Sequence, residues 1–295
     1  MNDLKWMILQ GKADVNSEGI HYSGVNDQTT TALKCNHSFV GGEIRFVVSF
    51  EPLKTAKKPQ KLFIGLNDGS DKPKLYIGCT SYGSYFIDQQ TPSGWNRLDS
   101  TGEDLLNIDP VAVEVRVKVA GSSISLFAND VKVCQSTQAQ LANAQITLAF
   151  EGKGAINATE FAVESTKLKA FIIMQFGQYD YIYSHVIKPI CDKKDINCVR
   201  ADEYHYPGSI LKDIINSLVD SDIIVADITP DNPNVYFEVG YAYALGKNPI
   251  LLMDRARESV PFDISGFRVI MYNNTIEGAS KVKDQFDKYL SEFVR

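Results

Sequence analysis

The amino-acid sequence predicts two domains: an all-β jelly-roll sandwich in residues 1–166 and an α/β domain with a parallel sheet in residues 167–295. Three observations lead to this prediction. The chain has 295 residues, which is longer than most single hydrophobic cores support. Its first part contains many short β-like segments separated by turn sequences. Its second part alternates short apolar segments with helix-like segments, which is typical of a parallel sheet covered by helices.

The strands of the first domain are predicted from alternating polarity and from β-branched and aromatic residues. The segment Ala112–Val119 alternates cleanly, which indicates a strand with one face in water. Gly-Ser, Asn-Asp-Gly and Asn-Asp sequences between the segments are typical of turns. Many strands without helices indicate a sandwich or jelly roll. The predicted strands are 43–51, 61–66, 74–79, 111–119, 123–128, 131–134, 146–151 and 159–164.

The second domain begins with the continuous apolar segment Ala170–Met174, which indicates a strand buried on both faces. Five such strands in this order predict a flavodoxin-like parallel sheet, in which ligands bind at the carboxyl ends of the strands. The predicted strands are 170–174, 198–201, 222–226, 249–253 and 268–272, and the predicted helices are 181–193, 209–220, 233–245 and 278–293.

The helix that follows Asn232 contains one residue that calls for an explanation. Asn232 and Pro233 have the residue types of an N-cap and a first helical position, and Gly246 that of the residue after a helix end. Between them the chain is apolar except for one asparagine and one charge, Glu238. A helix that is apolar on every side is expected to be buried. We therefore expect the Glu238 carboxyl to be neutral, paired or held for chemistry.

Composition and charge argue against several classes of function. The net charge is −6, and neither domain has more basic than acidic residues, which argues against binding a nucleic-acid backbone. Five cysteines without a C-x-x-C pair and four scattered histidines argue against a disulfide framework and a metal site. No apolar stretch approaches the roughly 18 residues of a membrane span, and no signal-peptide pattern is present. We predict a cytoplasmic protein without a metal, a cofactor or a membrane partner.

Five segments of the second domain carry a resemblance to a known superfamily. They are 171–177 (FIIMQFG), 179–183 (YDYIY), 200–202 (RAD), 221–229 (SDIIVADIT) and 232–247 (NPNVYFEVGYAYALGK). On these segments the domain resembles the nucleoside 2-deoxyribosyltransferase-like superfamily, whose neighbours include the TIR domains. In that superfamily the glutamate of an E-x-G-x-A helix is the nucleophile, and the match places this role on Glu238. In the first domain, segments 41–46, 124–131 and 160–164 are similar to concanavalin-like or laminin-G-like jelly rolls.

The predicted chemistry is cleavage of an N-glycosidic bond, because a carboxylate can stabilise or trap the oxocarbenium-like state of that reaction. Glu238 is the predicted catalytic carboxylate; the alternative is a glutamate paired with a lysine or arginine in the core. Asp227, at the end of a strand, is the second predicted catalytic residue, with capping or loop stabilisation as its alternative. The predicted substrate-binding residues are Gln175, Phe176, Gly177, Arg200, Asp202, Thr229, Asn232, Asn234 and Tyr241.

Structural roles are open alternatives for several of these residues. Arg200 and Asp202 are equally compatible with a surface ion pair, and Gly177 with simple turn geometry. The tyrosines of this domain are equally compatible with ordinary packing.

The resemblance implies cleavage of NAD, as a substrate, to nicotinamide and an ADP-ribose product. Nicotinamide leaves as a neutral molecule and needs no proton, whereas a purine needs a general acid. Deoxyribosyltransferases have an aspartate for that step at the position that is Asn232 here. The resemblance also implies a bacterial antiviral defence effector that forms a homo-oligomer, with the sandwich used for sensing, binding or oligomerisation. The alternatives are a nucleoside 2-deoxyribosyltransferase of salvage metabolism, a non-catalytic module that binds a nucleotide signal, and a jelly roll that binds a glycan.

Overall fold

The protein folds into two compact units. One unit comprises Met1–Val119 and Ser123–Thr166, and the other comprises Ala120–Ser122 and Lys167–Arg295. The sensing, binding or oligomerisation role assigned to the first domain stays a prediction at this point. The computed structural model describes residues 4–24, 30–52, 58–70, 72–102, 112–139, 141–175, 177, 179–201, 210–229, 231–257, 267 and 269–294.

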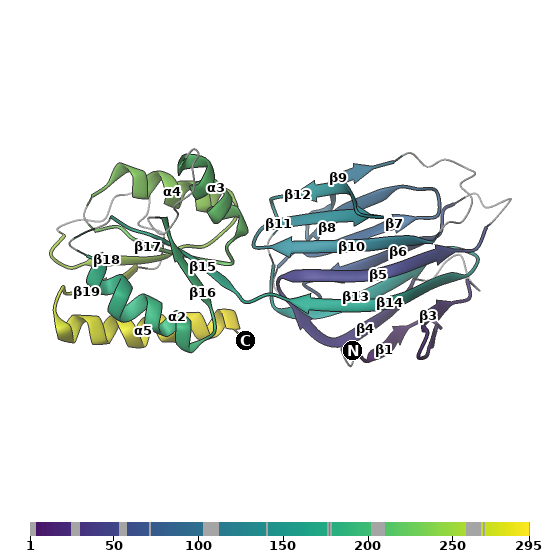
Figure 1. Cartoon of the computed structure of the whole chain (residues 1–295), viewed down its shortest axis with the longest axis horizontal. Coiled ribbons are helices and arrows are strands. Elements are labelled where there is room, and N and C mark those ends of the chain that lie inside the picture. Colours follow the sequence, from purple (N-terminus) through teal and green to yellow (C-terminus); the bar gives the residue numbers. More distant parts are fainter. Residues whose placement is uncertain are drawn as a thin grey trace. The chain divides into compact units, whose positions relative to one another are not determined.

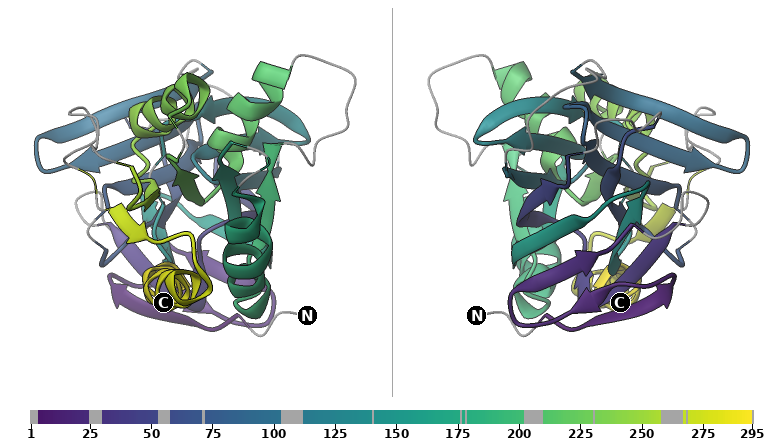
Figure 2. Two further views of the ribbon diagram at one scale, coloured as in Figure 1. Left: turned by 90° about the vertical axis from the view of Figure 1, so that its left-hand side faces the viewer. Right: turned by 90° about the vertical axis from the view of Figure 1, so that its right-hand side faces the viewer.

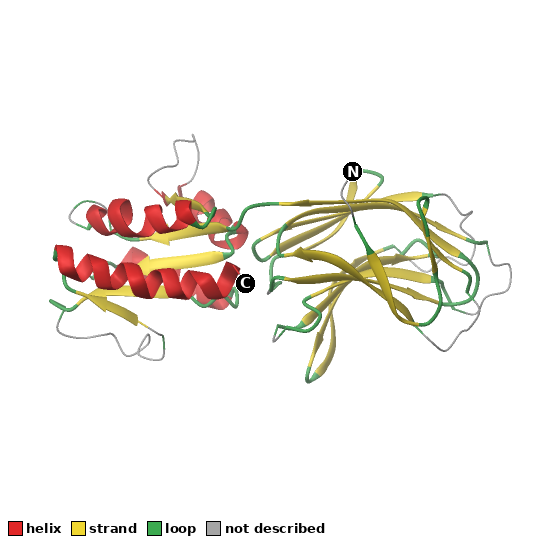
Figure 3. Cartoon of the chain, turned by 90° about the horizontal axis from the view of Figure 1, so that it is seen from below, coloured by secondary structure: helices red, strands yellow, loops and turns green. Residues whose placement is uncertain are grey.

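The first unit is a sandwich of two antiparallel sheets that face each other across one core (Figures 1 and 3). The first sheet contains β1 (Trp6–Gln10), β4 (Thr31–Phe39), β6 (Lys61–Leu66), β7 (Lys74–Thr80), β8 (Tyr85–Thr91), β9 (Gly94–Thr101) and β13 (Ala144–Glu151). The second sheet contains β2 (Asp14–Val15), β3 (Gly19–Tyr22), β5 (Gly42–Phe50), β10 (Val113–Ala120), β11 (Ser123–Ala128), β12 (Val131–Ser136) and β14 (Ile156–Ser165). The spatial orders are β1-β4-β13-β6-β7-β8-β9 and β12-β11-β10-β5-β14-β3-β2.

The sandwich forms because alternate residues of its central strands, such as β4, β5, β10 and β11, face the opposite sheet and are buried. In β10 the residues Val115, Val117 and Val119 are buried in the core, while their neighbours lie on the other face. The predicted all-β fold is therefore confirmed. The predicted strands correspond to β5, β6, β7 and β10–β14, whereas β1–β4, β8 and β9 are not among them. The sequences of β8 (YFIDQQT) and β9 (GWNRLDST) are largely polar, so they lack the apolar enrichment on which the prediction depends.

The second unit is built on a parallel sheet of five strands in the order β16-β15-β17-β18-β19. Their bounds are β15 (Lys169–Ile173), β16 (Asn197–Arg200), β17 (Ile223–Asp227), β18 (Ile250–Asp254) and β19 (Val269–Tyr272). Every residue of β17 and β18 is buried, as expected for strands with both faces covered. The predicted parallel sheet is confirmed, and the finer flavodoxin-like assignment stays a prediction.

Helices cover both faces of this sheet. The helices are α1 (Asp180–Ile182), the π-helix η1 (Tyr183–Ile187), α2 (Lys188–Lys193), α3 (Ile210–Asp220), α4 (Pro233–Ala244) and α5 (Ile276–Val294). One buried cluster joins the sheet to α3 and α4, and another joins the opposite face to η1, α2 and α5 (Figures 1 and 2). The predicted helix 181–193 contains a π-helical turn just before Pro189, which has no N–H for an intrahelical hydrogen bond. No helix within the described ranges has both the length and the apolar composition to span a membrane.

Helix α4 has the expected start and end but not the expected burial. Asn232 is its N-cap, Pro233 is its first residue, and Gly246 follows the helix end with φ +74°. Val235, Val239 and Ala242 pack on the sheet, whereas Phe237 is 52% exposed and Tyr243 is 60% exposed. The expectation of a helix buried on every side is therefore wrong. An outer helix on a covered sheet has only one side against the sheet, and apolar composition alone does not show which side that is.

Candidate functional site

Glu238 lies on α4 and is only partly exposed. Burial raises the pKa of its carboxyl to about 7. Glu238 forms neither a hydrogen bond nor an ion pair with any other described residue. The core ion pair considered as an alternative for Glu238 is thus not found among the described residues, and the carboxyl group is one that titrates near neutral pH.

Asp227 ends β17 and is 1% exposed. Its Oδ1 accepts a hydrogen bond from the Thr229 backbone N–H at 2.9 Å, and its Oδ2 accepts one from the Tyr272 hydroxyl at 2.6 Å. The Thr229 hydroxyl oxygen in turn accepts from the Asp254 N–H at 2.8 Å. Burial raises the pKa of Asp227 to about 7, although both hydrogen bonds lower it. These bonds match the loop-stabilising role that the sequence left open for Asp227.

The structure brings three of the predicted binding residues together at the start of α4. The Asn232 side-chain oxygen accepts from the Asn234 N–H at 2.9 Å, and its amide nitrogen donates to the Gln175 side-chain oxygen at 3.3 Å. Asn232 is therefore a helix cap that also holds the end of the β15 segment in place.

The remaining predicted residues of the second unit do not join this group. Arg200 donates to Asp180 at 2.7 Å, and its guanidinium lies 4.4 Å from the centre of the Tyr183 ring. Gly177 has a φ of +106°, which favours glycine. The Tyr241 ring lies 6.3 Å from that of Phe237. Phe176 and Asp202 lie outside the described residues.

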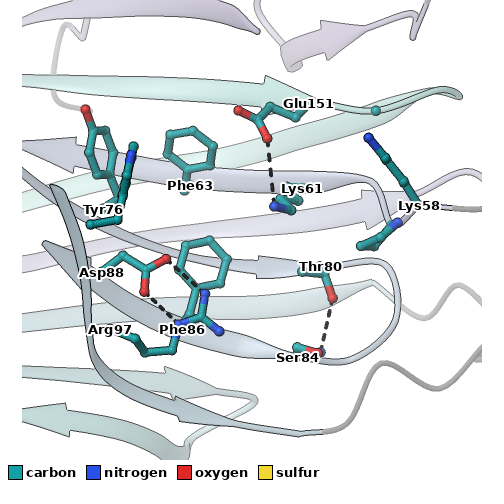
Figure 4. Close-up of a pocket in the computed structure, with 13 residues that line it drawn as sticks. Lys58, Lys61, Phe63, Tyr76, Thr80, Ser84, Phe86, Asp88, Arg97 and Glu151 are labelled. Carbon is teal, nitrogen blue, oxygen red and sulfur yellow. Dashed lines mark hydrogen bonds and ion pairs between the residues drawn. The ribbon is translucent and has the colours of Figure 1, made fainter. Parts of the chain in front are cut away.

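A second candidate site, which was not predicted from the sequence, is a groove on the outward face of the first sheet (Figure 4). It arises from the alternation of β6, β7 and β8, whose other face fills the core. Lys61 pairs with Thr80, Phe63 pairs with Gly78, and Tyr76 pairs with Asp88 across these strands. The groove has a volume of about 670 Å³ and is lined by Lys58, Pro59, Lys61, Phe63, Tyr76, Thr80, Ser84, Phe86, Asp88, Trp95, Arg97, Glu151 and Gly152.

Aromatic rings form the floor and one end of the groove. The Trp95 ring lies 5.0 Å from that of Tyr76, at an interplanar angle of 33°, and Trp95 is 64% exposed. Phe63 meets the Tyr76 ring edge-on at 5.4 Å, and it lies 6.4 Å from Phe86. Gly78 is paired between Phe63 and Phe86, and a Cβ atom there would lie 2.2 Å from the Leu62 carbonyl oxygen. The floor of the groove is thus apolar.

Charged side chains complete the groove beside these rings (Figure 4). Arg97 donates two hydrogen bonds to Asp88, from Nε to Oδ1 at 2.7 Å and from a terminal nitrogen to Oδ2 at 3.0 Å. This two-bond geometry fixes both groups in one plane. The Lys61 Nζ lies 4.0 Å from a carboxylate oxygen of Glu151. The arrangement therefore offers donors and acceptors side by side, next to aromatic faces.

The sequence carried a signal for this groove that the strand assignment did not use. Trp95 follows the turn Thr91–Gly94, and a tryptophan at the tip of a polar hairpin has no core to fill. Its ring partner Tyr76 lies on β7, so the proximity of the two rings depends on the pairing of β7, β8 and β9.

The similar structures named below each match about half of the chain. No family model and no curated protein matches it. The carbohydrate-binding module CBM66 from Bacillus subtilis matches 54% of this chain and 95% of its own, with 10% identity and a TM-score of 0.42. A Bacillus licheniformis β-glucanase matches 57% and 94%, with 11% identity and a TM-score of 0.40. A Bacillus subtilis protein of unknown function with a galectin-like fold matches 55% and 89%, with 9% identity and a TM-score of 0.40.

The likeness concerns an all-β fold of the jelly-roll or galectin type. At these identities and scores, nothing that those proteins bind or cleave is transferred to this chain. None of the three is described as a deoxyribosyltransferase or a TIR domain. The resemblance stated for the second domain therefore has no support in them.

The comparisons contradict the function predicted from the sequence. The similar structures are described as a carbohydrate-binding module, a β-glucanase and a galectin-like protein, not as proteins that cleave NAD. Cleavage of NAD is withdrawn, together with nucleoside deoxyribosyl transfer and nucleotide-signal binding; antiviral defence and an oligomer are unsupported. The prediction depended on the resemblance of the second domain and on Glu238 in a helix taken to be buried on every side, and that helix has an exposed side. The catalytic roles of Glu238 and Asp227 stay predictions without a substrate.

Proposed function

We propose that the first unit binds a carbohydrate in the groove on the outward face of its first sheet. One observation carries this proposal. The exposed ring of Trp95, set against Tyr76, lies on the same face of the sheet as the Arg97–Asp88 ion pair. The proposal does not depend on the distant similarities reported above.

An aromatic ring next to a charged pair matches the two surfaces of a sugar. A sugar ring presents C–H groups on its faces, and these pack on the electron-rich face of an aromatic ring. Trp95 is 64% exposed, so most of its ring is available to such a face. Tyr76 supports it from β7, on the far side of β8, and the Tyr76 hydroxyl is fixed by donating to Gln90 at 3.1 Å. The aromatic pair is therefore a preformed platform.

The hydroxyl groups of a sugar need both donors and acceptors around the ring, because each hydroxyl donates one hydrogen bond and accepts others. Asp88 supplies carboxylate oxygens, each of which accepts one bond from Arg97 and has a further lone pair. Hydrogen bonds to charged groups are stronger than those between neutral groups. The volume of about 670 Å³ lies within the range of small-molecule sites.

The groove favours binding over cleavage. Among the described residues, its lining has two carboxyl groups, Asp88 and Glu151. Asp88 is held by Arg97, and Glu151 accepts a hydrogen bond from the Thr30 hydroxyl at 2.9 Å and lies beside Lys61. Glycoside cleavage needs one carboxyl group that donates a proton and one free carboxylate across the bond. Asp88 and Glu151 are instead both engaged by neighbouring side chains.

Titration of the purified chain with a panel of oligosaccharides tests the proposal. The chain has two tryptophans, so a Trp6→Phe background leaves the fluorescence of Trp95 as the reporter. We expect the Trp95 emission to change on binding and to saturate. In calorimetry with the natural Trp6, Trp95→Ala should weaken binding on the order of tenfold, because a ring–ring contact is lost.

Val131→Ala is the matched control, since Val131 is also 64% exposed but lies on β12 of the second sheet. It should leave the affinity unchanged. Binding to no member of the panel, or equal affinity in the wild-type chain and Trp95→Ala, would contradict the proposal.

A further inference from the structure

The groove has two chemically different ends (Figure 4). Tyr76 lies at one end with Trp95 against it, Lys58 lies at the other, and the rings of Phe63 and Phe86 lie between them. Thr80 pairs with Lys61 and follows Tyr76 by four residues on the same strand. At the rise of a β-strand this separation is about 13 Å. It exceeds the width of one sugar ring, so a ligand that touches both ends has more than one ring.

Positive charge exceeds negative charge at the end marked by Lys58. Lys58 and Lys61 line this end, and Glu151 is the one carboxylate that the described residues place beside them. The Thr30 hydroxyl already donates to Glu151, and the Lys61 Nζ is 4.0 Å away from it. Lys58 is exposed and forms no ion pair with another described residue. One ammonium group at this end is thus not balanced by a carboxylate of the groove.

The aromatic end does not offset this charge. Asp88, the carboxylate that the described lining places at this end, forms two hydrogen bonds to Arg97, so the pair is neutral together. The chain as a whole has a net charge of −6, which makes a positive end in this groove a local exception. A cleft lined by one sign of charge concentrates ligands of the opposite sign.

We propose that the groove selects an acidic oligosaccharide, with one sugar ring on Tyr76 and Trp95 and an anionic group at Lys58 and Lys61. The anionic group is a carboxylate or a sulfate, since both are oxyanions that lysine ammonium groups bind. This inference rests on the proposed carbohydrate binding and adds its charge selectivity.

A glycan array with matched sets tests this inference. Each set contains one oligosaccharide backbone in a neutral, a carboxylated and a sulfated form, and the wild-type chain is then titrated with the members of the set that binds. We expect an acidic form to bind about fivefold more tightly than the neutral form, as two partly exposed ion pairs allow. The preference should shrink as salt is raised, because exposed charges are screened. Comparing the two acidic forms distinguishes a carboxylate from a sulfate.

Two pairs of lysine substitutions make the test specific. Lys58→Gln with Lys61→Gln should remove the preference for the acidic forms over the neutral form. Lys118→Gln with Lys132→Gln removes the same charge from the second sheet, where both lysines are exposed, and should keep the preference.

The outcomes separate the two proposals. Equal affinity for neutral and acidic forms overturns the inference and leaves carbohydrate binding standing. A preference that survives the groove substitutions, or binding of acidic forms that Trp95→Ala does not weaken, also overturns the inference. Binding to none of the sets overturns both.

Discussion

Asp227 couples the stability of the second unit to pH. Its carboxyl is buried at the end of β17, and burial raises its pKa from 3.8 to about 7. The folded state therefore holds this proton more tightly than the unfolded state does. The protonated Asp227 carboxyl stabilises the folded state fully below about pH 4, and this stabilisation is lost as the pH rises through about 7. Between these pH values, ionisation of Asp227 lowers the free energy of unfolding by at most about 1.4 kcal/mol per pH unit.

Asp227→Asn should remove this dependence. An amide cannot ionise, and its oxygen still accepts from the Thr229 N–H. We expect the variant to be more stable than the wild-type chain at pH 8 and to lose that advantage at pH 5. Cys191 and Cys198 are buried in the second unit, so the rate at which a thiol reagent labels them, followed by mass spectrometry, reports its opening.

The comparison of variant and wild type at each pH cancels the intrinsic pH dependence of thiol labelling. Glu277→Gln removes a carboxyl whose side chain is 82% exposed, and it should leave the pH profile unchanged. A wild-type profile that Asp227→Asn does not alter would show that this carboxyl titrates at its ordinary pKa.

At the scale of elements, the start of α4 is fixed by its N-cap. The Asn232 side chain accepts from the Asn234 N–H, and Pro233 at the first position needs no acceptor. Asn232→Ala should destabilise the second unit by about 1 kcal/mol, because the cap is lost. Hydrogen exchange of the amides in the first turn of α4 measures the effect.

Asn232→Asp keeps an oxygen acceptor at the cap and should restore the protection of these amides. It would not restore the bond that the Asn232 amide nitrogen donates to Gln175. Loss of protection in both variants would therefore assign the stabilisation to Gln175 rather than to the cap.

The sequence predicts elements well where composition and burial agree. β10 alternates valine with polar residues, and β17 is apolar throughout, so both are recognised from local pattern. β9 contains no buried residue and β8 contains only two, so the apolar pattern that reveals a strand is absent there. The groove could not be predicted from local sequence either, because the distance between Tyr76 and Trp95 is set by strand pairing and not by sequence spacing. The bounds of α4 were predictable from its caps, whereas the exposure of Phe237 was not.

At the scale of the whole molecule, each unit has a core of its own. The core of the sandwich is formed by buried residues between Ile20 and Val163, and the cores of the second unit by residues between Ala170 and Leu290. These clusters share no residue. A domain with its own core is expected to fold alone.

A fragment of residues 1–166 should therefore fold as an all-β unit and bind the same oligosaccharides as the full chain. Far-UV circular dichroism measures its secondary structure, and calorimetry measures its affinity, which Trp95→Ala should reduce as in the full chain. Substantial helix in the fragment, or aggregation without a cooperative unfolding transition, would contradict independent folding. A folded fragment without affinity would instead show that the second unit contributes to binding.

The pleat of β6, β7 and β8 has a consequence for how such a protein can evolve. Residues 61, 63, 76 and 88 line the groove, and residues 62, 64, 75, 77 and 87 of the same strands are buried in the core. Single codon changes at the groove positions can therefore alter the lining of the groove while the fold is inherited unchanged. Insertion or deletion of one codon within a strand would turn its core residues outward and its groove residues inward, so the core and the groove would both be disrupted. Drift in this lineage should accordingly accumulate as substitutions at alternate positions, with length changes confined to the turns.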